Sequence, residues 1–318
     1  MAGRAAEIAA ALGGEAEVIH PLGGRGAARK LARYAVSAAF TLLYLARARP
    51  RALIVTNPPI FAGLVAYAYK RLTGAPMLLD SHPGGFGLQG DRLSARLRPL
   101  TRWLVRRVDS TLVTEPSLQT LVEGWGGKAD LLHEAPPLWS VAQARAPEGR
   151  PRLLFVGVFQ RDEPVEEVVT AARELPEVDV EITGDPAKAP AGLIGSAPEN
   201  VRFLGYLDAP AYVAALERAD VILAITTEPT SVVRAGYEAI YAGRPLVLSD
   251  TPTLRSVFPH AVHVDNTGAA IAAGVRDAVD RHAELLALVP AADALQRSRW
   301  KGQLATLQTR LLLQQPDR

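Results

Sequence analysis

Short runs of consecutive apolar residues alternate with longer segments of helical spacing along the whole chain. Runs such as LIVT at 53–56 and MLLD at 77–80 are typical of strands buried on both faces of a parallel sheet. In the first half we expect strands at Glu17–Ile19, Ala52–Thr56, Met77–Asp80, Ser110–Thr114 and Ala129–Leu132. In the second half we expect them at Arg152–Val156, Val178–Thr183, Val201–Leu204, Val221–Ile225, Pro245–Leu248 and Ala261–Val264. The alternation predicts two α/β doubly wound units.

The domain organisation follows from length and from one break in the pattern. A chain of 318 residues favours two domains. The segment 134–150, EAPPLWSVAQARAPEGR, is rich in Pro, Ala and Gly and has no periodicity, as a linker would. We expect an N-terminal domain over 1–137, a linker over 138–150, a second domain over 151–290 and a long helix over 291–318. Because the chain opens in a helix-like segment, Arg4–Leu12, either the first strand of the sheet is missing or the sheet has one strand fewer.

Composition excludes several classes of chemistry. Hydrophobic residues make up 48% of the chain, so it can bury a core and is not disordered as a whole. With no cysteine, disulfides and thiolate chemistry are excluded, and six scattered histidines show no metal-ligand spacing, so we expect no metal. Residues 1–150 carry a net charge of +8 and residues 151–318 a net charge of −6, which predicts different partners for the two halves.

No segment is expected to cross a membrane. The uncharged run Tyr34–Ala46 has 13 residues, against roughly 20 needed to span a bilayer. A second apolar run, Ala52–Tyr69, is interrupted by Asn57-Pro58-Pro59. The start of the chain lacks the features of a signal peptide, and we expect a cytoplasmic protein, either free or peripheral at the inner face of the membrane.

Candidate chemistry in the first half follows two predicted strands, where ligands of doubly wound sheets bind. His82 comes directly after the strand MLLD and precedes the glycines Gly84 and Gly85. It can reach a sugar hydroxyl or a phosphate, or it can bond the backbone of its own loop. Asn57 offers an amide at the end of the preceding strand, although the two prolines after it also suit a stiff helix start.

Candidate chemistry in the second half begins where the strand RLLFVG ends. Gly157 would let the backbone approach a diphosphate, and Arg161 is a guanidinium suited to phosphate oxygens or an ordinary surface arginine. Gly184 and Tyr206 follow the next two strands, where a glycine most often serves a turn and a loop could line a nucleobase slot.

The most informative stretch is TTEPTSVVRAGYEAIYAGRPLVLS at 226–249. A helix predicted to begin near Ser231 carries Glu238, which could accept from two vicinal hydroxyls of a ribose. Amides at the start of that helix could receive a phosphate. A solvated helix glutamate is the alternative, but small and apolar neighbours indicate a packed face.

These residues resemble a known family. The segments FVGVFQRDEPVEEVV, ITGD, PENVRFLGYL and ADVILAITTEPTSVVRAGYEAIYAGRPLVLSDTP are similar to the nucleotide-binding half of family 4 glycosyltransferases with the GT-B fold. The resemblance implies two Rossmann-like domains facing across a cleft and a metal-independent sugar transferase. Its donor would be a UDP- or GDP-linked sugar, with no further cofactor.

The resemblance also implies roles for individual residues. Glu238 matches the glutamate that holds the ribose, while Thr230 stands where a glutamate usually contacts the donor sugar and Glu228 could substitute for it. His82 matches a histidine near the transferred sugar, and Gly157–Arg161 matches the phosphate-binding turn, with the usual Arg and Lys pair reduced to Arg161. The expected donor-binding residues are Gly157, Arg161, Gly184, Tyr206, Glu228, Thr230, Ser231, Val232 and Glu238, with His82 and Arg161 catalytic and Asn57, Gly84 and Gly85 on the acceptor side.

Basic helices suggest where an acceptor binds. Six arginines lie within 91–108, and four cations at 25–33 precede the apolar run Tyr34–Ala46. Such a surface suits an anionic membrane or a lipid-pyrophosphate acceptor, as in cell-surface polysaccharide synthesis, and is equally compatible with a solvated helix face. Nucleic acid is not expected, because few aromatic residues interleave with the cations. A nucleotide-sugar epimerase and a truncated, non-catalytic partner subunit remain as alternative functions.

Overall fold

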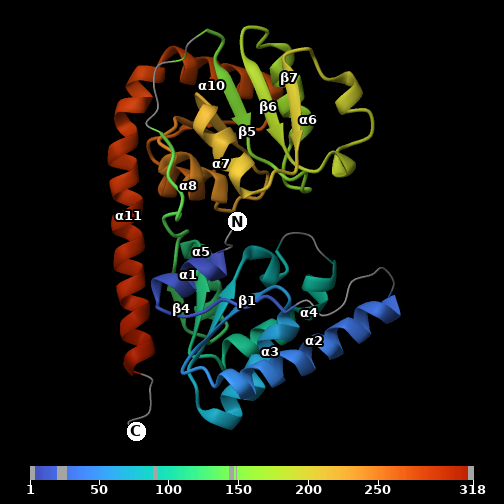
Figure 1. Cartoon of the computed structure of the whole chain (residues 1–318), viewed down its shortest axis with the longest axis vertical. Coiled ribbons are helices and arrows are strands. Elements are labelled where there is room, and N and C mark those ends of the chain that lie inside the picture. Colours follow the sequence, from blue (N-terminus) through green and yellow to red (C-terminus); the bar gives the residue numbers. More distant parts are fainter. Residues whose placement is uncertain (1–3, 20–26, 89–91, 143–146, 148, 314–318) are drawn as a thin grey trace. The chain divides into compact units, whose positions relative to one another are not determined.

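The computed structural model describes residues 4–19, 27–88, 92–142, 147 and 149–313, and for 27–35, 92 and 312–313 it describes the backbone alone. The described chain divides into two compact units. The N-terminal unit comprises residues up to 135 together with residues from 299 onward, and the C-terminal unit comprises residues 136–298. Each unit is built on its own parallel sheet (Figure 1).

The N-terminal unit has a four-stranded sheet in the order β1-β2-β3-β4, with every pair parallel. Its strands are β1 (Leu53–Asn57), β2 (Met77–Ser81), β3 (Ser110–Val113) and β4 (Ala129–Leu131). Its helices are α1 (Arg4–Ala11), α2 (Ala27–Ala48), α3 (Ile60–Thr73), α4 (Arg92–Val105) and α5 (Pro116–Gly124), with a 3-10 turn η1 (Pro83–Phe86). The order never reverses, so the crossover helices α3, α4 and α5 lie on one face of the sheet.

The two faces of this sheet are covered by different elements. Met77 and Leu79 pack with residues of α3, α4 and α5, whereas Leu78 packs with Ile8 of α1 and Trp300 of the last helix. Successive side chains of a strand point to opposite faces, so the run MLL supplies both cores at once. This is why the strand reads as a continuous apolar run in the sequence.

The C-terminal unit has a six-stranded sheet in the order β10-β9-β8-β5-β6-β7. Its strands are β5 (Arg152–Phe155), β6 (Asp179–Thr183), β7 (Val201–Gly205), β8 (Val221–Ala224), β9 (Leu246–Ser249) and β10 (Val262–Val264). Its helices are α6 (Val165–Arg173), α7 (Ala209–Arg218), α8 (Arg234–Tyr241), α9 (Pro252–Val257) and α10 (Gly268–Asp280), with 3-10 turns η2 (Pro186–Lys188) and η3 (Ile194–Ser196). The strand order reverses between β5 and β8, and the carboxyl ends of the two strands at such a switch point frame a ligand crevice.

The fold class expected from the sequence is confirmed, and most expected strands form. The expected strand at Glu17–Ile19 is wrong, because residues 14–19 are irregular. Within the described residues no strand precedes β1, which stands at the edge of its sheet. Three residues of weak alternation bury too little apolar surface to hold a strand in place.

The last helix, α11 (His282–Leu313), begins nine residues before the expected start at 291. Pro290, one residue before the expected start, lies inside this helix, although proline is favoured in the first turn of a helix. Proline costs one backbone hydrogen bond. Leu285 and Ala292, on either side of Pro290, are buried in the cores of the C-terminal unit, and this packing offsets that loss. Among the described helices, none has both the length and the apolar character needed to cross a bilayer.

Candidate functional site

The switch point of the C-terminal unit brings two loops together, those that follow β5 and β8. Asp162 of the first loop accepts a hydrogen bond on its carboxylate from the Thr226 hydroxyl at 3.0 Å. Its carbonyl oxygen accepts from the amide of Thr227 at 2.7 Å. The segments expected to bind phosphate and sugar are therefore tied to each other across 64 residues of sequence.

The loop after β5 presents a row of backbone amides. Gly157 is buried, and its amide donates to the Thr183 hydroxyl at 3.0 Å. Phe159 has a φ of 59°, in the left-handed region, which turns consecutive amides toward one point. That point is occupied by the Glu163 carboxylate, which accepts from the amides of Val158 at 2.8 Å and Gln160 at 3.1 Å. Sequence reasoning considered Glu163, with Asp162 and Glu228, only as an acid for the alternative epimerase and did not place it at the phosphate-binding turn, where Arg161 is exposed.

Burial raises the pKa of Glu163, and the nearby charge of Asp162 adds to the rise. The backbone amides act in the opposite direction, since they favour the ionised carboxylate. The carboxylate is thus held in its loop by the amides of Val158 and Gln160, against the cost of desolvation.

Gly184 and Tyr206 take different positions at the carboxyl edge of the same sheet. Gly184 has a φ of 125°, and a Cβ there would come within 2.8 Å of the Phe159 ring. The glycine thus lets the ring of the β5 loop pack against the end of β6. Tyr206 follows the edge strand β7 and is 79% exposed. No contact in the described structure joins Tyr206 to the other expected site residues.

Glu238 is a buried carboxylate of this unit, with 6% of its surface exposed. It lies in α8, where Gly236 allows the helix to pack closely on Phe258. Its carboxylate accepts from the Tyr212 hydroxyl at 2.5 Å and from Arg234 Nε at 3.0 Å. Burial and the neighbouring charge of Glu238 hold the pKa of Tyr212 well above its usual range, so the phenol stays a proton donor.

The loop before α8 is longer than expected. The helix begins at Arg234, so Ser231 and Val232 lie in the loop that precedes it. Local hydrogen bonds form a turn in that loop: the Glu228 carboxylate accepts from the Thr230 hydroxyl at 2.8 Å, and the Glu228 backbone carbonyl accepts from the Ser231 amide at 3.1 Å. Glu228 and Thr230, the two candidates for a sugar contact, are therefore joined to each other. Glu238 is not joined to this pair, since its carboxylate bonds Tyr212 and Arg234.

The N-terminal unit places its expected residues at the carboxyl ends of β1 and β2. Buried Asn57 donates from Nδ2 to the Ser81 hydroxyl at 2.9 Å, and its carbonyl oxygen accepts from the His82 amide at 3.1 Å. A Cβ at Gly85 would lie 2.5 Å from Asn57 Nδ2, so the loop can close over Asn57 only with glycine there. Asn57, His82 and Gly85 are brought together. Gly84 lies between His82 and Gly85, half-exposed in η1.

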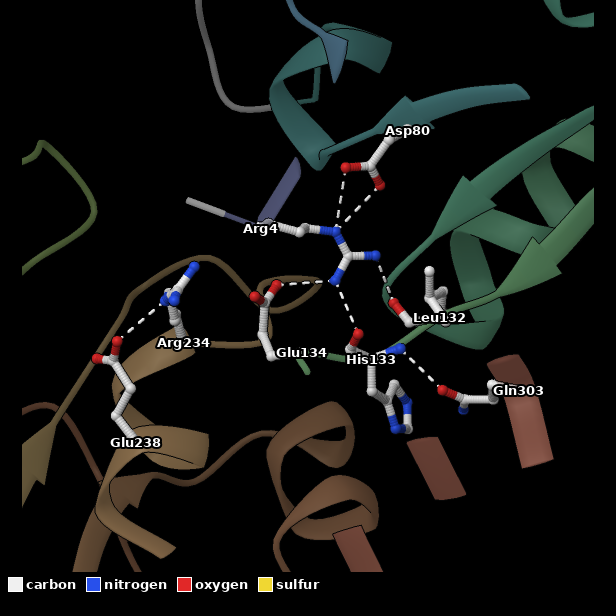
Figure 2. A network of polar contacts seen from close by, with 8 residues as sticks. All are labelled: Arg4, Asp80, Leu132, His133, Glu134, Arg234, Glu238 and Gln303. Carbon is white, nitrogen blue, oxygen red and sulfur yellow. Dashed lines mark hydrogen bonds and ion pairs between the residues drawn. The ribbon is translucent and has the colours of Figure 1, made fainter. Parts of the chain in front are cut away.

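A second polar network of this unit escaped the sequence analysis. Figure 2 shows the guanidinium of Arg4 bonded to both oxygens of Asp80 at 3.1 Å and to Glu134 at 2.9 Å. The guanidinium also donates to the carbonyls of His133 and Leu132. Arg4 therefore fastens α1 to the carboxyl ends of β2 and β4. Nothing local in the sequence marks this contact, since the partners lie 76 and 130 residues away.

His133 is buried next to this network. Burial lowers its pKa to about 4, and the charges of Arg299 and Arg4 act in the same direction. Its ring is therefore neutral at physiological pH. Across the described residues, no group of three or more His, Asp or Glu side chains could hold a metal ion.

Comparisons with known proteins identify both halves of the chain. Residues 3–137 match the family model of the glycosyl transferase 4-like domain, and residues 140–298 match that of glycosyl transferases group 1. Among curated proteins no match is found.

Solved structures give the fold. The chain is similar to sucrose-phosphate synthase from Thermosynechococcus elongatus, with 18% identity, a TM-score of 0.71, and coverage of 91% of this chain and 80% of that one. It is similar to HepE from Anabaena in complex with UDP and glucose, with 13% identity, a TM-score of 0.66, and coverage of 94% and 85%. It is also similar to α,α-trehalose 6-phosphate synthase from Burkholderia multivorans, with 14% identity, a TM-score of 0.61, and coverage of 93% of this chain and 79% of that one. The family expected from the sequence is confirmed: the chain has the GT-B fold and belongs to the glycosyl transferases group 1 family.

Proposed function

We propose that this glycosyltransferase moves a sugar from a UDP- or GDP-linked donor to a hydroxyl acceptor. The observation that carries the proposal is the switch point between β5 and β8, where the amide-rich loop of β5 is bonded to the loop of β8. Ligands of open α/β sheets bind at such a point. The crystallised HepE complexes with UDP and with UDP-glucose support the donor class.

Glu238 is proposed to hold the ribose. A carboxylate has about four acceptor positions, and Tyr212 and Arg234 use two of them in this structure. The remaining positions can accept from vicinal hydroxyls without a change of fold. Tyr212 and Arg234 then act as positioning residues, because they fix the carboxylate in one orientation.

Departure of the diphosphate is the step that needs stabilisation. Arg161, which is exposed, and the amides of the β5 loop, two of which bond Glu163 in the free protein, are proposed as donors for the developing negative charge. On the N-terminal unit, His82 is proposed to orient the sugar, with Asn57 and Gly85 fixing its loop and Gly84 beside the acceptor. No metal is assigned a role in this proposal.

The acceptor is proposed to be presented at a membrane surface. On α4 the side chains of Arg96, Arg98 and Arg102 are exposed, and no described carboxylate pairs with them. Trp103 is 37% exposed, and the guanidinium carbon of Arg107 lies 4.3 Å from the centre of its ring. Exposed Phe40 and Leu43 lie on α2, which packs on α3, as α4 does. Cations interleaved with exposed apolar side chains suit an anionic lipid surface better than a soluble polyanion.

Calorimetric titration with UDP and GDP tests the proposed donor site. We expect one of the two to bind, and Glu238→Gln to weaken that binding roughly tenfold, since a hydrogen bond to a charged group is lost. Glutamine preserves the size of the side chain and can still accept from Tyr212. Glu199→Gln is the control, because Glu199 is exposed and precedes the edge strand β7, whereas Glu238 lies on the helix between β8 and β9.

Equal binding by wild type and Glu238→Gln would contradict the role of Glu238. A donor sugar that is isomerised without any acceptor would identify an epimerase instead. Absence of binding by both nucleotides would contradict the proposed donor class altogether.

A further inference from the structure

The loop that follows β5 has the geometry of an anion-binding nest. Successive backbone amides converge in right-handed–left-handed pairs of residues and in turns, and such concavities hold phosphates and other anions. Phe159 supplies the left-handed residue with its φ of 59°. The amides of Val158 and Gln160 flank it and point to one oxygen atom.

That oxygen belongs to the protein itself. Glu163 Oε2 accepts from Val158 at 2.8 Å and from Gln160 at 3.1 Å, and it lies 3.0 Å from the point where a Cβ on Gly157 would stand. The Phe155 ring, whose Cε1 lies 2.6 Å from that point, and the Glu163 carboxylate together occupy the space that a side chain on Gly157 would need. A glycine that lets a ligand approach the backbone here lets Glu163 approach it instead.

A carboxylate and a phosphate cannot share these donors. Each amide has one hydrogen, and two anions in contact in a half-buried site repel each other strongly. Asp162 adds a second negative charge next to the nest, while the β8 loop contributes the neutral hydroxyls of Thr226 and Thr227 there. Arg161 is the cation of this loop, and it is exposed.

We propose that Glu163 controls ligand binding at the β5 loop: its carboxylate occupies the anion nest in the free protein, and a diphosphate binds there only after displacing it. The proposal rests on the proposed function for the identity of the ligand and goes beyond it in naming the competitor. Affinity for a diphosphate then equals the affinity of the empty nest reduced by the stability of the internal contact. Only ligands that bind the amides more strongly than the Glu163 carboxylate does can then occupy the nest.

Removing the charge of Glu163 tests this directly. Glu163→Gln and Glu163→Ala are titrated with inorganic pyrophosphate and with UDP, beside wild type and the control Glu166→Gln. Glu166 lies exposed in the first turn of α6, so its substitution changes net charge equally without touching the nest. We expect both Glu163 variants to bind pyrophosphate at least tenfold more tightly than wild type, and Glu166→Gln to bind it as wild type does. Circular dichroism confirms that every variant is folded.

The outcomes separate this inference from the proposed function. Pyrophosphate affinity that is unchanged or lower in both Glu163 variants, or that cannot be detected in any of the proteins, would overturn the role of Glu163. Tighter pyrophosphate binding in the Glu163 variants, with no binding of UDP or GDP by any of them, would support the nest and contradict the nucleotide donor. An equal gain in Glu166→Gln would show a general charge effect and overturn the proposal.

Discussion

At the scale of single residues, the structure is governed by charges that find partners far away in the sequence. Arg4 is buried and has four oxygen-bearing partners: Asp80, Glu134 and the carbonyls of Leu132 and His133. Burying a guanidinium without such partners would cost several kcal/mol, so α1 can dock only where these acceptors converge. In the C-terminal unit two carboxylates are also hydrogen-bonded. Glu238 accepts from the Tyr212 phenol and the Arg234 guanidinium, and Glu163 accepts from backbone amides.

Arg4→Leu is expected to lower the free energy of unfolding of the N-terminal unit by about 3–5 kcal/mol, because two buried carboxylates lose their cation. Urea unfolding followed by tryptophan fluorescence measures it, since Trp103, Trp125 and Trp300 belong to this unit. Arg71→Leu, at an exposed position of α3, should change the value by less than about 0.5 kcal/mol. Neutralising Asp80 and Glu134 together with Arg4→Leu should recover part of the loss. A single variant as stable as wild type would contradict the network.

His133 makes the stability of the same unit depend on pH. Its pKa is about 4 in the folded protein, against 6.5 for an exposed histidine. Below pH 6.5 the unfolded chain binds a proton that the folded protein does not, so this contribution is complete above pH 6.5 and is lost as the pH falls toward 4. The loss approaches roughly 3 kcal/mol, at about 1.4 kcal/mol per pH unit. His133→Gln cannot titrate, and urea unfolding across this window should show a correspondingly flatter dependence. Parallel curves for the two proteins would refute the assignment.

At the scale of elements, the loops decide more than the helices and strands. The apolar runs predicted the strands to within a residue or two, because both faces of each sheet are covered and each strand must be apolar throughout. The start of α8 was misplaced by three residues, since Val233 precedes it without a side-chain cap and Thr230 and Ser231 bond to Glu228 instead of the helix. Thr230 and Ser231 can either start the helix or bond to Glu228. The hydrogen bond between Thr226 and Asp162, which fixes the β8 loop, favours the bonds to Glu228.

Helix α4 carries the proposal of membrane association. We expect the protein to sediment with vesicles that contain phosphatidylglycerol, and the triple variant Arg96→Gln, Arg98→Gln and Arg102→Gln to bind them more than tenfold less tightly. Each arginine near an anionic surface contributes about 1 kcal/mol. A triple variant at Arg173, Arg202 and Arg276, exposed in the C-terminal unit, removes the same charge and should bind as wild type does. Wild type left in the supernatant, or equal binding by both triple variants, would refute the proposal.

At the scale of the whole molecule, the two parallel sheets differ in topology and carry different sets of candidate site residues. The C-terminal sheet reverses its strand order and so has a switch point, whereas the four strands described in the N-terminal unit follow one another without a reversal. In the C-terminal unit the loops after β5 and β8 are bonded to each other and α8 carries the buried Glu238, whereas Asn57, His82 and Gly85 lie together in the N-terminal unit. The family membership and the GT-B fold agree with this division.

The sequence by itself determined the two α/β units, nearly all the strands, the glycines at strand ends and the family, because each of these depends on local periodicity and on residue type. Tertiary structure alone decided which groups meet. Arg4 finds Asp80 and Glu134, Tyr212 finds Glu238, and the carboxylate of Glu163 turns back into the amides of its own loop. The physical reason is that hydrogen bonding and desolvation depend on distances in space, which apolar patterning along the chain does not record.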